Sequence, residues 1–164
     1  IIENGTIKNF LKIKNKLLPH INEKFLNEIS GTTDTEFIFF MLLTILEKNK
    51  KHIKNQKNQS QVLKDSMIEL LHIFEKQKIE ISANLIFTDD EYIVITRYLY
   101  FNPENFKKNQ YPPSLYYYYY GDKGSLLITS EPITKNFHIF PMNTIMIINT
   151  KTMIMNYDVI PTLQ

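Results

Sequence analysis

The chain has 164 residues and a formal charge of +2, with 43% hydrophobic and 13% aromatic residues. This length suits one domain with a core that buries roughly 70% of the unfolded surface, and the apolar content argues against intrinsic disorder. The near-neutral charge predicts no nucleic-acid partner, because the many lysines and the single arginine are typical of a compositional bias and not of a basic patch.

Cysteine is absent and the four histidines are scattered without metal-ligand spacing. These facts exclude a disulfide scaffold and a cysteine-based zinc site, and we expect no metal. The longest apolar run, residues 37–46, is about half of the roughly 20 residues that a bilayer span needs. We therefore expect a buried helix there and no membrane association. The absence of cysteine favours an intracellular setting, and we expect a cytoplasmic location.

The first half of the chain shows the apolar spacing of helices. From Ile7 to Leu18 this spacing continues until Pro19, and Gly31 separates a short second helix from a third, strongly apolar one. A segment rich in Lys, Asn and Gln then precedes a further amphipathic pattern. We expect four helices, at 7–18, 22–29, from 33 onward and at 62–74, with a polar surface linker at 48–60.

The second half is rich in β-branched and aromatic runs separated by turn residues. Residues 89–91 and 121–124 are typical of hairpin tips, and Lys151-Thr152 is expected to join two terminal strands. Helices followed by antiparallel strands predict the α+β class. The expected strands are 81–87, 92–98, 115–120, 126–129 and 144–148.

Two short motifs in the first 36 residues each allow two interpretations. Asn4-Gly5 is typical of a type I′ hairpin turn, yet the same pair can aim N–H donors at an oxyanion. Thr33 to Glu36 fits a helix capping box with Thr33 as N-cap, yet the Asp34 carboxylate could instead bind an ammonium group of a ligand.

The segments Glu3-Asn4-Gly5-Thr6-Ile7 and Gly31-Thr32-Thr33-Asp34-Thr35-Glu36 resemble the class II glutamine amidotransferases. In these N-terminal nucleophile hydrolases, a first-residue cysteine attacks the side-chain amide of glutamine or a γ-glutamyl group. The resemblance continues, in the family's order, through Ala83–Asp89, Thr96–Tyr98, Pro112–Tyr116 and Ser130–Pro132.

This resemblance implies a four-layer αββα sandwich that is incomplete at the N-terminus. Residues 1–164 would be the C-terminal portion of a single glutamine amidotransferase type 2 domain, with the cysteine and an arginine for the substrate carboxylate upstream of Ile1. Asn4 and Gly5 would supply the oxyanion hole, and Asp34 would hold the substrate's α-ammonium. No cofactor is required. Glu3 departs from the family, whose members commonly carry His there.

The motifs are most similar to the branch that holds the amidotransferase subunit of glutathione degradation and the amidohydrolase of ergothioneine synthesis. This implies hydrolysis of a γ-glutamyl amide, in glutathione-like compounds or glutamine, and a peptidase-like partner subunit. The 164-residue chain alone should be inactive. Two alternatives stay open: an ammonia-donating glutaminase domain of a synthase, and a non-catalytic interaction subunit or decayed copy.

Arg97 is the only arginine in the sequence. Its planar guanidinium group is expected to bind a substrate carboxylate or a cluster of buried carbonyl groups, or to pair with Asp89, Asp90 or Glu131. The five tyrosines from 116 to 120 should alternate between the two faces of a strand, mostly for packing.

Overall fold

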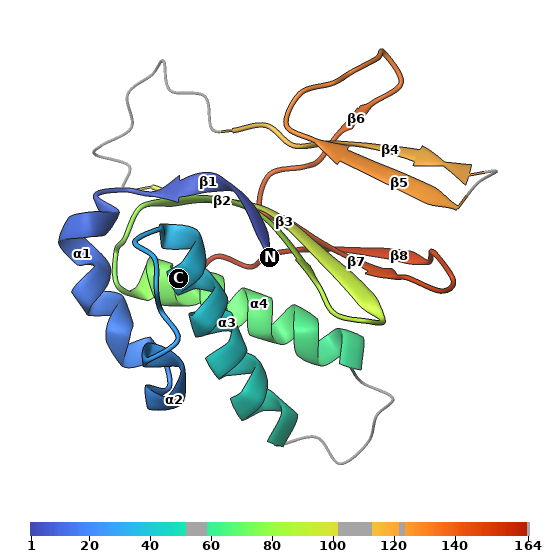
Figure 1. The fold of residues 1–164 in the computed structure, drawn as a ribbon. Helices are drawn as coiled ribbons and strands as arrows, with labels where there is room; N and C mark the ends of the chain where they lie inside the picture. The colour runs from blue at the N-terminus through green and yellow to red at the C-terminus, as the bar shows by residue number, and fades with distance from the viewer. Residues whose placement is uncertain (52–58, 102–112, 122–123, 164) are drawn as a thin grey trace.

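The computed structural model describes residues 1–51, 59–101, 113–121 and 124–163. These residues form three layers, which Figure 1 shows from the helices below to a small sheet above. A five-stranded sheet lies in the middle, and all the described helices lie on one side of it. The chain is thus built as two stacked sheets with a helical layer on one outer face.

The central sheet is antiparallel throughout, in the order β1-β2-β3-β7-β8. Its middle strands are hydrophobic on both faces because each face is covered by another layer. β1 is at one edge and β8 at the other. The strands span Ile2–Ile7 (β1), Ile81–Thr88 (β2), Tyr92–Tyr100 (β3), Thr144–Asn149 (β7) and Met155–Val159 (β8).

The small sheet packs against the face of the central sheet that the helices leave open. Its order is β5-β4-β6, and it consists of Tyr116–Tyr120 (β4), Ser125–Thr129 (β5) and His138–Ile139 (β6). The layer between the two sheets contains an apolar cluster formed by Ile95, Leu115, Phe140, Met146 and Ile148.

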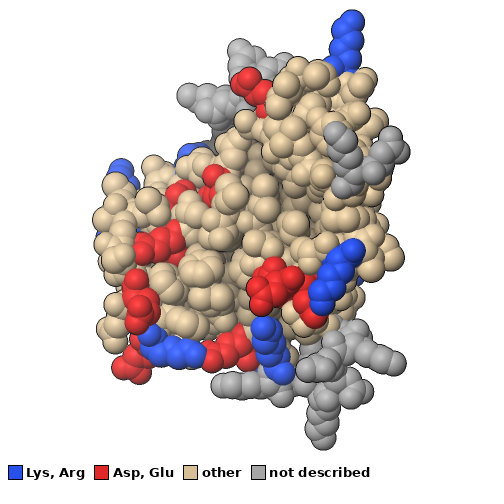
Figure 2. Space-filling view, turned by 45° about the vertical axis from the view of Figure 1, so that its right-hand side comes forward, with Lys and Arg blue, Asp and Glu red and all other residues tan. Residues whose placement is uncertain are grey.

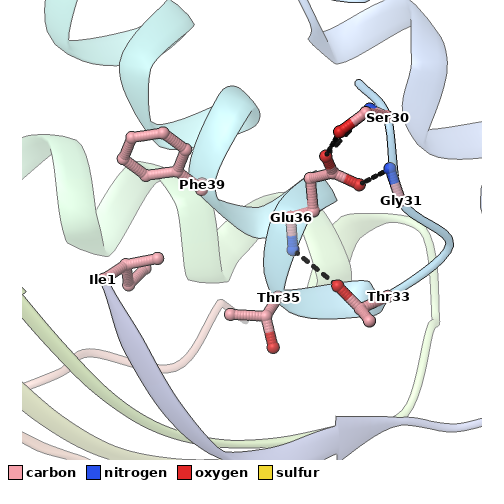
Figure 3. A pocket seen from close by; sticks show the side chains of 7 residues that line it. All are labelled: Ile1, Ser30, Gly31, Thr33, Thr35, Glu36 and Phe39. Atoms are coloured by element: carbon pink, nitrogen blue, oxygen red, sulfur yellow. Dashed lines mark hydrogen bonds between the residues drawn. The ribbon is translucent and has the colours of Figure 1, made fainter. Parts of the chain in front are cut away.

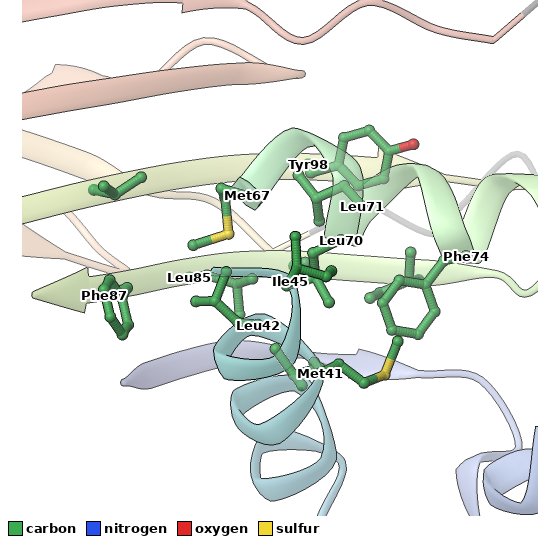
Figure 4. Packing of buried hydrophobic residues seen from close by; sticks show 14 of the residues in the cluster. Met41, Leu42, Ile45, Met67, Leu70, Leu71, Phe74, Leu85, Phe87 and Tyr98 are labelled. Carbon is green, nitrogen blue, oxygen red and sulfur yellow. The ribbon is translucent and has the colours of Figure 1, made fainter. Parts of the chain in front are cut away.

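The helices cover the other face of the central sheet. Their bounds are Phe10–Leu17 (α1), Glu23–Leu26 (α2), Asp34–Lys51 (α3) and Gln59–Lys76 (α4), with a 3-10 turn at Leu18–His20. Leu42 of α3 and Leu70 and Phe74 of α4 are fully buried against Leu85 of β2 and Tyr98 of β3 (Figure 4). This interface is the main hydrophobic core.

The structure confirms most of the elements expected from the sequence. Helices α3 and α4 and strands β2, β3, β4, β5 and β7 lie where the patterns predicted them, and Lys151-Thr152 joins β7 to β8. The α+β class is confirmed, and the described residues form one helix layer and two stacked sheets, which are three of the four layers that the resemblance implied. Residues 52–58 of the expected linker, Asp122-Lys123 and Pro112 lie outside the described residues.

Two expectations at the start of the chain are wrong. Ile7 does not begin a helix, and Asn4-Gly5 is not a hairpin turn, because residues 2–7 form β1 and pair with β2. The first helix begins only at Phe10, after Asn9 has adopted a left-handed conformation with φ 56°. Local turn propensity is overridden here by pairing with a strand about eighty residues away.

Charged side chains are distributed unevenly over the face shown in Figure 2. Basic and acidic groups alternate along the lower part, over the helices, whereas the upper part, where the small sheet lies, carries few charges. Large apolar side chains of this upper region, such as Ile133 and Ile139, are exposed. No helix in the described part of the chain is long and apolar enough to cross a membrane.

Candidate functional site

The outer edge of β1 carries the Asn-Gly pair. The N–H of Lys8 bonds the carbonyl of Glu80 at 3.0 Å, and hydrogen-bonded pairs alternate along an antiparallel ladder. Asn4 is therefore paired with Asn84, whereas the N–H groups of Gly5 and Ile7 face away from β2. The side chain of Asn4 is exposed. The edge thus presents a main-chain donor next to a carboxamide.

Gly5 is required by a close approach of the two strands. A Cβ atom at this position would lie 2.0 Å from the main-chain oxygen of Ser82, a distance that no side chain can tolerate. Glycine is therefore needed at position 5 for close strand packing and not for a positive φ angle. This is the physical reason why the turn interpretation of Asn4-Gly5 fails while the pair remains an available donor set.

Asp34 joins the edge of β1 to the first turn of α3. Its Oδ2 accepts the outward-facing N–H of Ile7 at 3.0 Å, and its Oδ1 accepts the N–H of Thr35 at 3.1 Å. Each carboxylate oxygen retains a second acceptor site. The structure therefore brings Asp34 and the Asn4-Gly5 pair to the same strand edge, as the resemblance implied for a shared site.

The capping box at this helix start is present in a modified form. Thr33 is the N-cap, and its Oγ1 accepts the N–H of Glu36 at 3.4 Å. The Glu36 carboxylate does not return to Thr33 but accepts the N–H groups of Ser30 at 2.9 Å and Gly31 at 2.8 Å (Figure 3). Glu36 thus holds the loop before α3 closed.

Glu3 is a site residue whose role the sequence did not reveal. Its Oε2 accepts the hydroxyl of Thr35 at 2.6 Å, and its Oε1 is buried without a hydrogen-bond partner. Burial raises the pKa of Glu3 from 4.5 to about 7, against the hydrogen bond from Thr35, and the neighbouring Asp34 carboxylate raises it further. A proton can therefore reside on Glu3 near neutral pH.

A pocket of about 380 Å³ opens beside these groups. Its volume is in the range of small-molecule sites. Threonine and serine hydroxyls and the Glu36 carboxylate supply its polar lining, and two large side chains supply its apolar lining. The lining residues are Ile1, Ser30, Gly31, Thr33, Thr35, Glu36 and Phe39, which Figure 3 shows around the start of α3.

Arg97 lies apart from this pocket, in the layer between the two sheets. Its side chain is buried, and its Nη1 donates to the main-chain oxygen of Phe140 at 2.7 Å. Burial lowers the pKa of Arg97 from its ordinary value. Among the described residues Arg97 makes no ion pair with Asp89, Asp90 or Glu131. Of the partners expected for Arg97, the structure shows one buried carbonyl group, that of Phe140.

In the described part of the chain, no group of three or more His, Asp or Glu side chains is arranged to hold a metal ion. The site offers groups for hydrogen bonding and for charge. The donors face outward from β1, and the acceptors project from the first turn of α3.

Comparison with known proteins identifies relatives of this chain. No model of a known protein family matches the sequence. A protein of Saccharomyces cerevisiae named "Probable glutamine amidotransferase DUG3" is 31% identical over 110 residues. This match covers 60% of the present chain and 31% of the yeast protein, so the chain spans about a third of that relative.

A solved structure shares the fold. The class II glutamine aminotransferase domain protein SPO2029 from Silicibacter pomeroyi superimposes with a TM-score of 0.65 at 16% identity. The superposition covers 99% of this chain and 67% of that protein. The chain therefore shares its arrangement of helices and sheets with that solved domain.

Proposed function

Since this chain is similar in sequence to a probable glutamine amidotransferase and in fold to a class-II glutamine aminotransferase domain, we propose that its protein hydrolyses a γ-glutamyl amide. In this proposal, as the family resemblance implies, the nucleophile is a cysteine thiolate, which the 164 residues do not contain. The thiolate adds to the amide carbonyl, the amine leaves with a proton, and water then cleaves the thioester to release a free γ-carboxylate. Glutathione-like compounds and glutamine are the substrate class.

The observation that carries this proposal is the outward-facing N–H of Gly5 beside the exposed carboxamide of Asn4. When the thiolate adds to the amide, negative charge develops on the carbonyl oxygen. A pair of fixed N–H donors stabilises this charge, and the loss of one such donor typically costs roughly 2.7–4 kcal/mol. Because β1 is held by β2 on one side and by Asp34 on the other, the main-chain N–H of Gly5 is fixed before substrate binds.

Asp34 supplies the proposed contact to the substrate's α-ammonium group. Its carboxylate accepts the N–H of Ile7, which is the next outward-facing N–H along the strand edge after that of Gly5. The two backbone donors orient the Asp34 carboxylate, and its remaining acceptor sites are available for a charge-assisted hydrogen bond. Such a contact selects γ-glutamyl compounds over simple amides.

The test uses the complete protein that contains this chain. Asn4→Ala should lower kcat by roughly 10²–10³ with a smaller effect on KM, because the lost donor acts mainly in the transition state. Thr6→Ala is the matched control, since Thr6 is an exposed residue on the same face of β1. A change confined to KM, or an equal loss in Thr6→Ala, would argue against the oxyanion role.

A non-catalytic role as an interaction subunit or decayed copy is the second candidate. It is favoured by the exposed apolar side chains of the small sheet. Ammonia donation to a synthase is the rival within enzymes. Hydrolysis of γ-glutamyl compounds by the complete protein, without an added ammonia acceptor, would distinguish the proposed hydrolase from both the non-catalytic role and the ammonia-donating role.

A further inference from the structure

Two large buried polar side chains lie in the layer between the sheets. Asn84 of β2 is 3% exposed and Arg97 of β3 is 8% exposed, and the two residues are direct cross-strand partners. Both retain a buried polar atom without a hydrogen-bond partner, namely Asn84 Oδ1 and Arg97 Nε. Such groups are costly unless they perform a task, so their position needs an explanation.

Both side chains reach across to the small sheet. The Nδ2 of Asn84 donates to the carbonyl oxygens of Pro113 at 3.3 Å and Ser114 at 3.2 Å, just before β4. Arg97 donates to the carbonyl of Phe140, just after β6. The two segments that accept these hydrogen bonds are also joined to each other, since the N–H of Phe140 donates to the carbonyl oxygen of Leu115 at 2.7 Å. The contacts therefore close a ring between the two sheets.

The ring lies in register with the candidate oxyanion hole. Asn4, Asn84 and Arg97 occupy one row across β1, β2 and β3, and alternation along the strands places their side chains on the same face. Apolar contacts alone do not fix how one sheet slides over another, whereas directional hydrogen bonds do. The position of residues 113–115 relative to Asn4 thus depends on this row.

We propose that Asn84 and Arg97 are positioning residues that lock the small sheet over the row containing Asn4 and so fix the geometry of the oxyanion donors. Neither residue contacts the substrate in this arrangement. Arg97 is suited to this task because its fork can bind a carbonyl and remain charged in a buried layer, where a lysine offers only a point charge. The kinetic part of the inference rests on the proposed function, whereas the structural part stands without it.

The first arm of the test needs no activity. In the ¹⁵N-labelled complete protein, Arg97→Met keeps the volume but removes the donors, and it should shift the resonances of the Asn4 carboxamide and the Gly5 N–H. Thr96→Val is the matched control: Thr96 is fully buried beside Arg97 but bonds the carbonyl of Ala83 within the central sheet. It should leave the β1 resonances in place. If Arg97→Met does not fold, Arg97→Lys should show smaller shifts of the same resonances.

The second arm measures kinetics in the complete protein. Arg97→Met and Asn84→Leu should each lower kcat roughly tenfold to a hundredfold, the effect of a slight misplacement of catalytic groups, with KM changed less than about twofold. Arg97→Lys should restore part of the loss. Unmoved Asn4 and Gly5 resonances, or equal effects in Thr96→Val, would overturn the inference. A wild-type protein without activity would instead count against the proposed function, while the resonances would still decide the positioning role.

Discussion

Gly5 is the residue at which β1 leaves no room for a side chain. We predict that Gly5→Ala lowers the free energy of unfolding by at least about 1–3 kcal/mol, the range for overpacking, because its Cβ would meet the Ser82 carbonyl. Gly121→Ala is the control, since its Cβ would approach only the Tyr119 ring, at 3.7 Å. Chemical denaturation of both variants measures the difference, and equal stabilities would contradict the close approach.

Glu3 should make the stability of the chain depend on pH. Because its pKa in the folded state is about 7 and its ordinary value is 4.5, the folded state holds the proton more tightly. The contribution of Glu3 to stability is therefore fully present below pH 4.5, falls as pH rises towards 7, and is lost above about pH 7. At about 1.4 kcal/mol per pKa unit, reduced for partial exposure, we expect a loss of about 1–2 kcal/mol.

Glu3→Gln tests this pH dependence. The variant retains an acceptor for the Thr35 hydroxyl but carries no titratable group, so its stability should change less between pH 5 and about 8. It should be more stable than the wild type at the upper end. The exposed Glu28→Gln serves as control. Thermal unfolding across this range decides: parallel curves for Glu3→Gln and the wild type would show that Glu3 does not titrate there.

At the scale of single residues, the sequence identified candidates but not their contacts. Asn4, Gly5 and Asp34 were singled out by their resemblance to a family motif, and the structure places them along one strand edge. Glu3 was seen only as a departure from that motif. Its partnership with Thr35 joins residues 32 positions apart, a distance over which sequence spacing carries no spatial information.

The first turn of α3 is the element that couples β1 to the helical layer. From the capping motif alone, Asp34→Asn should preserve nearly all stability, since Asn and Asp cap equally well. The structure corrects this expectation, because both Asp34 oxygens accept backbone N–H groups and an asparagine offers only one oxygen. We now predict a loss of about 1–3 kcal/mol of stability in the 164-residue chain.

Asp34→Asn should also weaken substrate binding in the complete protein. Affinity for γ-glutamyl compounds should fall by roughly 1.5–3 kcal/mol, and discrimination against an analogue without the α-amino group should shrink. Asp65→Asn, on the exposed side of α4, is the control. Chemical denaturation measures the change in stability, and inhibition assays with the substrate and its analogue measure the change in affinity and discrimination. Lost stability with unchanged discrimination would leave Asp34 as a structural link only.

Long helices and strands could be predicted from the sequence where a single hydrophobic periodicity dominates. α3, α4 and the strands from β2 to β5 have unbroken apolar or aromatic patterns, and their hairpin tips carry turn residues. β8 was expected only as a partner of β7, because its sequence Met-Asn-Tyr-Asp-Val is largely exposed. β6 has two residues and exists only through its pairing with Tyr116 and Tyr117, so no local signal could reveal it.

For the whole molecule, the stacking of the sheets was implied by the family resemblance and not by the residue pattern. Strand runs predict an antiparallel sheet, but they do not tell which strands form the second one. Here the division follows from Arg97, Asn84 and the apolar cluster around Phe140, which attach β4 and β6 to the face opposite the helices. These contacts are tertiary, and no local window of sequence contains both of their ends.

The last prediction concerns catalysis by the chain as a whole. The 164 residues contain the proposed oxyanion donors and the proposed ammonium contact, but no thiol to attack an amide. The purified chain should therefore show no glutaminase or γ-glutamyl hydrolase turnover above a buffer control, even when correctly folded. Released glutamate is the quantity to measure, in parallel with Asn4→Ala. Turnover that disappears in Asn4→Ala would show that the chain holds its own nucleophile, and the cysteine mechanism would then be wrong.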